Sequence, residues 1–160
     1  MNRLILLVED EEHDVLFMGM ALEGAGVNNP LAVAWDGQEA IDYLNGQGKF
    51  ANRLEHPLPG LMLLDLRLPR VPGLDVLKWM RQSPERFQFP VFILSSSAQD
   101  CDVEDAYRLG AAAYIVKPSS PTELTQIAHR IKKYWLDADG PPKHCSDWLA
   151  FTVPRPYARG

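Results

Sequence analysis

The chain has 160 residues, of which 46% are hydrophobic, and its 16 basic and 21 acidic side chains give a net charge of −5. This length predicts one domain with a hydrophobic core. The acidic balance counts against nucleic-acid binding, which needs a basic surface. The apolar run of residues 4–8 is too short for a signal peptide or a membrane span. Cys101 and Cys145 lack CxxC spacing and are expected to be free thiols. We therefore expect a cytoplasmic protein without membrane contact.

Five short apolar runs alternate with five stretches of helical spacing. The runs are residues 4–8, 31–35, 61–64, 91–94 and 113–116, and the helical stretches are residues 15–25, 40–44, 74–80, 100–109 and 121–135. Unbroken apolar runs are typical of strands buried on both faces. Their alternation with helices indicates parallel strands joined by right-handed crossovers. We therefore predict an α/β fold, a doubly wound five-stranded parallel sheet with five helices.

Two segments fall outside this alternation. The polar stretch from Asn45 to Gly60 shows no period, and we predict a surface loop that is long enough to have a function of its own. Residues 138–160 contain four prolines and little periodicity, which predicts a surface tail. The expected organisation is one domain over residues 1–137 and a tail over residues 138–160 that forms no separate domain.

Polar side chains stand where the predicted strands end. They are Glu9 and Asp10 after the first strand, Asp65 after the third, Ser95 after the fourth and Lys117 after the fifth. Each alone is explained by a helix start, a turn or a solvated charge. However, the carboxyl ends of parallel strands meet at one edge of a sheet, where open α/β sheets bind ligands. The five groups together therefore predict a functional site.

The chemistry of this set indicates phosphoryl transfer. Crowded carboxylates repel each other, so the pKa of one of them rises unless a cation joins them. Mg²⁺ suits such a site, because it prefers one or two carboxylates together with water and phosphate oxygens. Asp65 could then act as the nucleophile, as carboxylates do in aspartyl-phosphate chemistry. Lys117 and Ser95 could neutralise and hydrogen-bond the phosphoryl oxygens.

Four motifs, LILLVED, LMLLDLRLPRVPGLDVL, PVFILSS and GAAAYIVKP, occur in this order along the chain. On these motifs the chain resembles a response-regulator receiver domain of the chemotaxis-regulator type, over roughly residues 3–136. The resemblance implies a flavodoxin-like fold and a two-component phosphorelay, in which a sensor histidine kinase is the phosphoryl donor. The long loop and the proline-containing tail resemble the single-domain regulators that accompany bacterial and cyanobacterial phytochrome kinases, so the resemblance points to a phytochrome-like kinase.

The resemblance also implies a role for each site residue. Asp65 would be the phosphoacceptor, Asp10 a direct Mg²⁺ ligand, Glu9 a ligand through water, the Arg67 backbone carbonyl a further ligand, Ser95 the switch hydroxyl, Tyr114 the rotating aromatic and Lys117 the phosphate-contacting lysine. The Lys117–Pro118 bond is expected to be cis. Two positions depart from the commoner pattern, because Glu9 replaces an aspartate and Ser95 replaces a threonine.

Two other classes of protein compete with this reading. A dehalogenase-like phosphatase also uses an aspartyl nucleophile but needs a second acid two residues later, where this chain has Arg67. A receiver that binds partners without phosphorylation would not need the intact set of acids, hydroxyl and lysine. We therefore expect a phosphoacceptor signalling protein and not an enzyme. With no DNA-binding output domain, it would signal through protein contact, including self-association through the face formed by the fourth helix, fifth strand and fifth helix.

Overall fold

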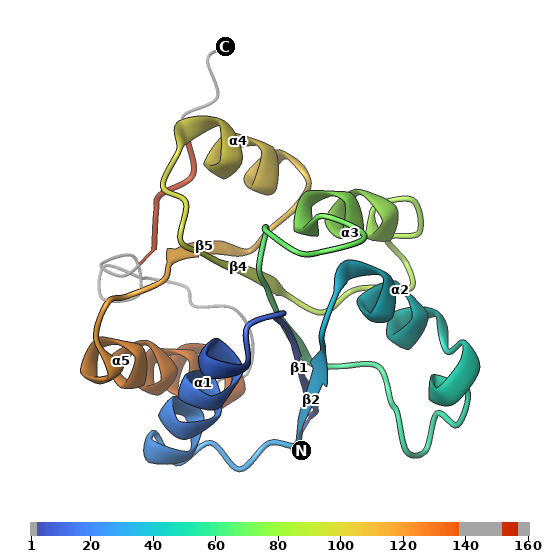
Figure 1. Ribbon diagram of the computed structural model, residues 1–160, viewed down its shortest axis with the longest axis horizontal. Helices are drawn as coiled ribbons and strands as arrows, with labels where there is room; N and C mark the ends of the chain where they lie inside the picture. The colour runs from blue at the N-terminus through green and yellow to red at the C-terminus, as the bar shows by residue number, and fades with distance from the viewer. Residues whose placement is uncertain (1–2, 138–151, 157–160) are drawn as a thin grey trace.

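The computed structural model of the chain describes residues 3–137 and 152–156. One parallel sheet has the strand order β2-β1-β3-β4-β5. Its strands are β1 (Ile5–Val8), β2 (Leu31–Ala34), β3 (Leu61–Leu64), β4 (Val91–Ser95) and β5 (Ala113–Val116), shown in Figure 1. The helices are α1 (Glu12–Gly24), α2 (Gly37–Asn45), α3 (Gly73–Met80), α4 (Asp100–Arg108) and α5 (Pro121–Ile131), with short helical segments η1 (Gly48–Phe50) and η2 (Lys132–Leu136). The predicted fold class is confirmed.

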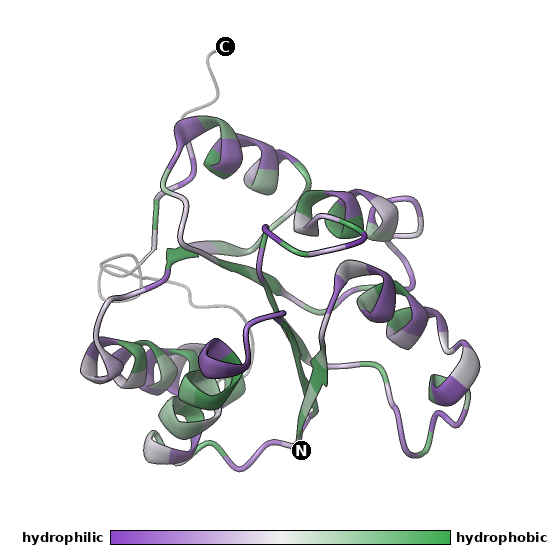
Figure 2. Cartoon of the chain, viewed as in Figure 1, coloured by the Kyte–Doolittle hydropathy of each residue, from purple (hydrophilic) through white to green (hydrophobic). Residues whose placement is uncertain are grey.

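The sheet separates two apolar layers, because alternate residues of a strand point to opposite faces. In β1, Leu6 and Val8 pack with α2, α3 and α4, whereas Ile5 and Leu7 pack with α1 and α5. Figures 1 and 2 show this arrangement, with apolar strands between helices whose outer surfaces are mostly polar. The strands read as continuous apolar runs because both faces of the sheet are covered. None of the helices in the described ranges is both long and apolar enough to cross a membrane.

Local signals place the helix ends. Ser120 accepts a hydrogen bond from the Glu123 amide at 3.2 Å, and Pro121 is the first residue of α5, as the sequence predicts. The last predicted helix does not continue unchanged to residue 135, because residues 132–136 form a π-helical turn. This wider turn accompanies an edge-on contact between the rings of Trp135 and Phe92, whose centroids are 4.8 Å apart.

The stretch from Asn45 to Gly60 is more ordered than a polar surface loop. It contains η1, and the ring of Phe50 is buried against Tyr43. The guanidinium of Arg53 donates to the carbonyl oxygens of Tyr43 and Leu44, both at 2.7 Å. These carbonyls lie in the last turn of α2, where a helix leaves its acceptors without partners. The loop therefore caps α2 from outside the helix, which the local pattern does not reveal.

Gly73 brings the start of α3 against the end of β3. A Cβ atom at this position would lie 2.1 Å from the Asp65 carbonyl oxygen and 2.8 Å from the Leu66 Cα atom. The Gly73 amide also donates to the Leu66 carbonyl at 2.9 Å. Since both obstacles are backbone atoms, no side chain could move aside to make room. The backbone position of Asp65 therefore depends on the absence of a side chain at residue 73.

We expect the substitution Gly73→Ala to displace the backbone of Asp65 and to lower the free energy of unfolding by about 1–3 kcal/mol through overpacking. Gly19→Ala is the matched control, because a Cβ at Gly19 in α1 would meet nothing within 4 Å. That change should raise stability by roughly 0.5–1 kcal/mol. Urea unfolding of both variants is the measurement. Equal stability of the two variants would show that the β3–α3 connection adjusts freely.

Candidate functional site

Three carboxylates meet at the carboxyl edge of the sheet. Glu9 and Asp10 follow β1 and Asp65 follows β3, and these two strands are neighbours in the sheet. One carboxylate oxygen from each of the three residues lies within 4.8 Å of the others. Glu9 and Asp65 are buried, with exposed fractions of 2% and 6%. The strand order therefore collects the acids that are more than fifty residues apart in the sequence.

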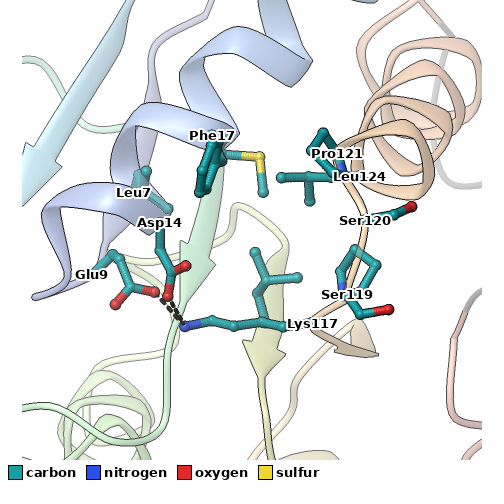
Figure 3. A pocket seen from close by; sticks show the side chains of 12 residues that line it. Leu7, Glu9, Asp14, Phe17, Lys117, Ser119, Ser120, Pro121 and Leu124 are labelled. Carbon is teal, nitrogen blue, oxygen red and sulfur yellow. Dashed lines mark hydrogen bonds and ion pairs between the residues drawn. The ribbon is translucent and has the colours of Figure 1, made fainter.

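Lys117 joins this cluster from the end of β5. Its ammonium lies 2.7 Å from Glu9 Oε2 and 2.9 Å from Asp65 Oδ2. The same nitrogen lies 2.9 Å from Asp14 Oδ2, so its three N–H groups each have a carboxylate partner. Figure 3 shows Glu9 and Asp14 directed toward the lysine. Such charge-assisted hydrogen bonds are roughly twice as strong as neutral ones.

Asp14 is a site residue that the sequence analysis missed. It lies in the first turn of α1, four residues after Asp10. This spacing was no signal, because Asp10 precedes the N-cap Glu11 and does not lie on a face of α1. An acid in a first turn is usually explained by the helix dipole. Its contact with Lys117 spans 103 positions of sequence and could not be found from the local pattern.

The pKa of Glu9 is raised to about 7 from the ordinary value of 4.5. Burial is the main cause, the charge of Asp65 adds to it, and the hydrogen bond from Lys117 opposes it. Burial lowers the pKa of Lys117, but the hydrogen bonds to Asp65, Glu9 and Asp14 outweigh burial and leave it above the ordinary value. The lysine is therefore cationic at neutral pH, whereas Glu9 is only partly ionised. A single ammonium does not neutralise this group of acids.

Backbone groups hold the two buried acids in place. The Arg67 amide donates to Asp65 Oδ1 at 3.1 Å, and the Glu11 amide donates to Glu9 Oε1 at 3.2 Å. The Asp65 amide donates to the Val8 carbonyl at 3.1 Å, which continues the β1–β3 ladder past the end of the strands. The Arg67 side chain is exposed. Asp65 thus presents its other oxygen, Oδ2, to Lys117.

Ser95 and Tyr114 form a second group beside the acids. Ser95 is the last residue of β4 and is fully buried, and its hydroxyl accepts from the Ser97 amide at 3.2 Å. The Tyr114 side chain is also fully buried, and its hydroxyl donates to the Ser97 carbonyl at 2.8 Å. Burial raises the pKa of Tyr114. The structure therefore connects the predicted switch hydroxyl and the predicted aromatic through the 95–97 turn.

A cavity of about 290 Å³ opens beside Lys117, between α1 and the β5–α5 connection (Figure 3). One end of it is polar, where Glu9, Asp14 and Lys117 meet. Most of its other lining is apolar and comes from α1, β4 and α5, and Ser119 and Ser120 add two polar residues. Leu16, Phe17 and Met20 of α1 are also exposed, at 57%, 44% and 58%. An apolar surface therefore borders the acid cluster.

The donor set fits a hard divalent cation. Carboxylate oxygens are the ligands that Mg²⁺ and Ca²⁺ prefer, and Glu9, Asp10 and Asp65 offer three of them at one place. The surplus of negative charge at the site also favours the binding of a cation. These residues can therefore hold a metal ion.

The prediction of a cis Lys117–Pro118 bond was wrong. Within the described residues every peptide bond is trans. A trans bond before proline is favoured by about 0.5–1 kcal/mol. With this bond trans, the Lys117 ammonium reaches all three carboxylates, so these contacts do not require the cis form.

Known proteins share this sequence pattern and fold. The chain is 33% identical over 135 residues to the response regulator Rcp1 of Synechocystis sp. (strain PCC 6803), covering 84% of this chain and 90% of Rcp1. The crystal structure of the Mn²⁺-bound form of Rcp1 superposes with a TM-score of 0.78 at 32% identity, over 88% of this chain and 99% of that one.

Two further solved structures are similar. The phosphorylated cyanobacterial phytochrome response regulator RcpA has a TM-score of 0.78 and 34% identity, over 85% of this chain and 95% of RcpA. The bacteriophytochrome response regulator AtBRR has a TM-score of 0.67 and 41% identity, over 80% of this chain and 90% of AtBRR. Since residues 5–129 match the response regulator receiver domain, and the acids and lysine expected from that resemblance meet in one cluster, the chain belongs to the response regulator receiver family.

Proposed function

We propose that this chain is a single-domain response regulator that accepts a phosphoryl group on Asp65 from the phosphohistidine of a sensor histidine kinase. The observation that supports this best is the meeting of three carboxylates with one lysine, whose ammonium is 2.9 Å from Asp65 Oδ2. The likeness to a phosphorylated phytochrome response regulator supports both the reaction and a phytochrome-like kinase as the donor. Its chemistry would be limited to its own phosphorylation and dephosphorylation, without a separate substrate.

The residues have complementary tasks in this reaction. An oxygen of Asp65 forms a bond to phosphorus while the bond from phosphorus to the donor histidine nitrogen breaks, and the leaving imidazole takes up the electron pair and a proton. Lys117 would exchange its contact with Asp65 for one with a phosphoryl oxygen, and the Ser95 hydroxyl would donate to another. Phosphoryl transfer demands mainly position and charge stabilisation from a protein, and these two residues supply both.

Mg²⁺ is the proposed metal ion. Glu9, Asp10, Asp65 and the Arg67 backbone carbonyl would hold it, with Glu9 acting through water, and it would supply positive charge beside the phosphoryl oxygens. Mg²⁺ commonly combines one or two carboxylates with substrate phosphate oxygens. The closeness of the three carboxylate oxygens supports this assignment. The Mn²⁺-bound form of Rcp1 shows that a similar protein binds a divalent cation.

The exposed apolar surface of α1 is the proposed docking site for the kinase. Phe17 lines the cavity next to Lys117, and Leu16 and Met20 are exposed on the same helix. A helix packed on this surface would therefore lie close to Lys117, whose ammonium contacts Asp65. After phosphorylation, the signal would leave through the face formed by α4, β5 and α5, by contact with another protein or a second copy of the chain. A cytoplasmic location would fit both partners, and no nucleic acid or membrane partner is proposed.

We expect acetyl phosphate with Mg²⁺ to phosphorylate the wild-type chain, and Asp65→Asn or excess EDTA to abolish this, because both the nucleophile and the cation are needed. Intact-protein mass spectrometry measures the product. Asp36→Asn is the control, since Asp36 caps α2 after β2 and asparagine also caps helices. Undiminished labelling of Asp65→Asn would assign the acceptor to another residue.

We expect the stability of the metal-free protein to decline as pH rises through the range between 4.5 and about 7, the ordinary and folded pKa values of Glu9. In this range the folded state holds a proton on Glu9 that the unfolded state has released, so raising the pH favours unfolding. Urea midpoints of wild type and Glu9→Gln measure the difference. The stability of Glu9→Gln relative to wild type should rise across this range, and a constant difference would contradict the raised pKa.

We expect the double substitution Phe17→Ser and Met20→Ser to slow phosphotransfer from a histidine kinase by about tenfold, the effect of losing roughly 1.4 kcal/mol of docking energy. The rate with acetyl phosphate should not change, because this small donor does not need the apolar surface. Leu54→Ser is the matched control, since Leu54 is 95% exposed in the loop before β3. Equal slowing with both donors would mean that the substitutions disturb the acid cluster itself.

A further inference from the structure

Among the residues that the structure describes, β5 is the last strand in the sheet order, and no strand lies beside its outer edge. Tyr114, in the middle of β5, turns both of its backbone groups toward this edge. Its N–H donates to the Tyr107 hydroxyl at 3.1 Å, and its carbonyl accepts from the Val153 N–H at 2.7 Å. An open edge invites pairing with any extended chain. Here residues 152–156, the part of the predicted tail that the structure describes, occupy it.

Tyr107 of α4 contacts the 152–156 segment from a second side. Its hydroxyl donates to the Val153 carbonyl, so one oxygen bridges the backbones of Tyr114 and Val153. The Arg155 guanidinium stands over the Tyr107 ring, 5.4 Å from its centroid. Thr152 is buried, and Val153 packs against the apolar layer under α4. In Figure 1 the 152–156 segment, drawn in red, runs beside α4.

The composition of the 152–156 segment suits this position. Val153 supplies the one N–H and the one carbonyl that the edge uses. Pro154 and Pro156 have no N–H to donate and hold the chain extended, which lowers the entropy lost on docking. Without these donors the segment cannot serve as a template for a further strand. The segment therefore covers the outer edge of β5 but does not add a strand to the sheet.

We propose that residues 152–156 are an intramolecular ligand of the β5 edge, which occupies the face of α4 and β5 and must leave before another chain can use that edge. The occupant is the chain's own segment, because two backbone hydrogen bonds, a cation–π contact and apolar burial all come from it. The surface it fits consists of the Tyr114 backbone and the Tyr107 side chain.

Tyr114 connects the 152–156 segment to the turn that follows Ser95. The backbone of Tyr114 binds Val153, while its side-chain hydroxyl binds the Ser97 carbonyl. If phosphorylation rearranges this turn, which rests on the proposed function, it changes the docking of the segment. Linkage is reciprocal, so docking then changes the equilibrium constant for phosphorylation of Asp65 by the same factor.

Amide hydrogen exchange of the unphosphorylated, full-length chain tests the docking directly by NMR. The Val153 amide should exchange at least about tenfold more slowly than that of exposed Arg155, as expected for a hydrogen bond that must open first. This ratio should stay constant over about a hundredfold range of protein concentration, because cis docking involves no second molecule. Equal exchange at the two residues, or protection that grows with concentration, would overturn the proposal.

Variants separate this contact from general stability. Tyr107→Phe keeps the ring but removes the bridging hydroxyl, and should accelerate Val153 exchange severalfold. Tyr43→Phe is the matched control, because it removes another tyrosine hydroxyl bond, to the Pro57 carbonyl, far from β5. It should leave Val153 exchange unchanged. No effect of Tyr107→Phe would overturn the role of Tyr107.

Sedimentation analysis tests whether the segment excludes another chain. Tyr107→Phe and Val153→Pro, which removes the amide donor, should both associate more strongly than wild type. Unchanged association of Tyr107→Phe, in which exchange of the Val153 amide reports the loss of docking, would overturn this exclusion. Because exchange is measured without phosphorylation, failure of the docking is distinguishable from failure of the proposed phosphoryl transfer.

Discussion

The contact of one ammonium with three carboxylates is the interaction on which the site depends. Lys117 has three N–H donors, and Glu9, Asp14 and Asp65 each accept one. Glu9 and Asp65 directly follow β1 and β3, and Asp14 lies in α1, so a single side chain at the sheet edge connects elements from separate parts of the chain. Removing one partner of a buried ion pair leaves an uncompensated charge, which is typically strongly destabilising. The lysine therefore organises the site before any phosphoryl group or metal ion arrives.

The same arrangement leaves a surplus of negative charge, and this surplus gives the site its chemistry. With Asp10 included, four carboxylates stand near one ammonium. Burial raises the pKa of Glu9, and the charge of Asp65 adds to this rise against the opposing hydrogen bond from Lys117. A divalent cation would relieve the repulsion between the carboxylates. A phosphoryl group would bring oxygens to this cation and to the Lys117 ammonium. Charge imbalance in the unmodified protein thus favours the ligands that the proposed reaction uses.

The proposed reaction site and the proposed signalling surface lie on different strands of the same sheet but remain connected. The acids lie at the centre, after β1 and β3, whereas Tyr114 lies on the edge strand β5. Tyr114 faces the turn after Ser95 with its hydroxyl and the 152–156 segment with its backbone. A packed core element of this kind moves between discrete arrangements and does not deform continuously. This is the physical basis that we propose for coupling a local change at Ser95 to a surface more distant from Asp65.

The sequence by itself determined the five strands and the presence of Glu9, Asp10, Asp65, Ser95 and Lys117 at one edge, since periodicity and strand ends are local signals. It predicted burial correctly for four strands, whereas β2 at the edge of the sheet is only partly buried. It also predicted the cap at Ser120. Only the tertiary structure decided that Asp14 binds Lys117, that Arg53 caps α2, that Lys117–Pro118 is trans and that Val153 docks on β5. The three contacts join residues that are 9, 39 and 103 positions apart. Such contacts depend on how the layers pack, and hydrophobic periodicity carries no information about which distant polar groups will meet.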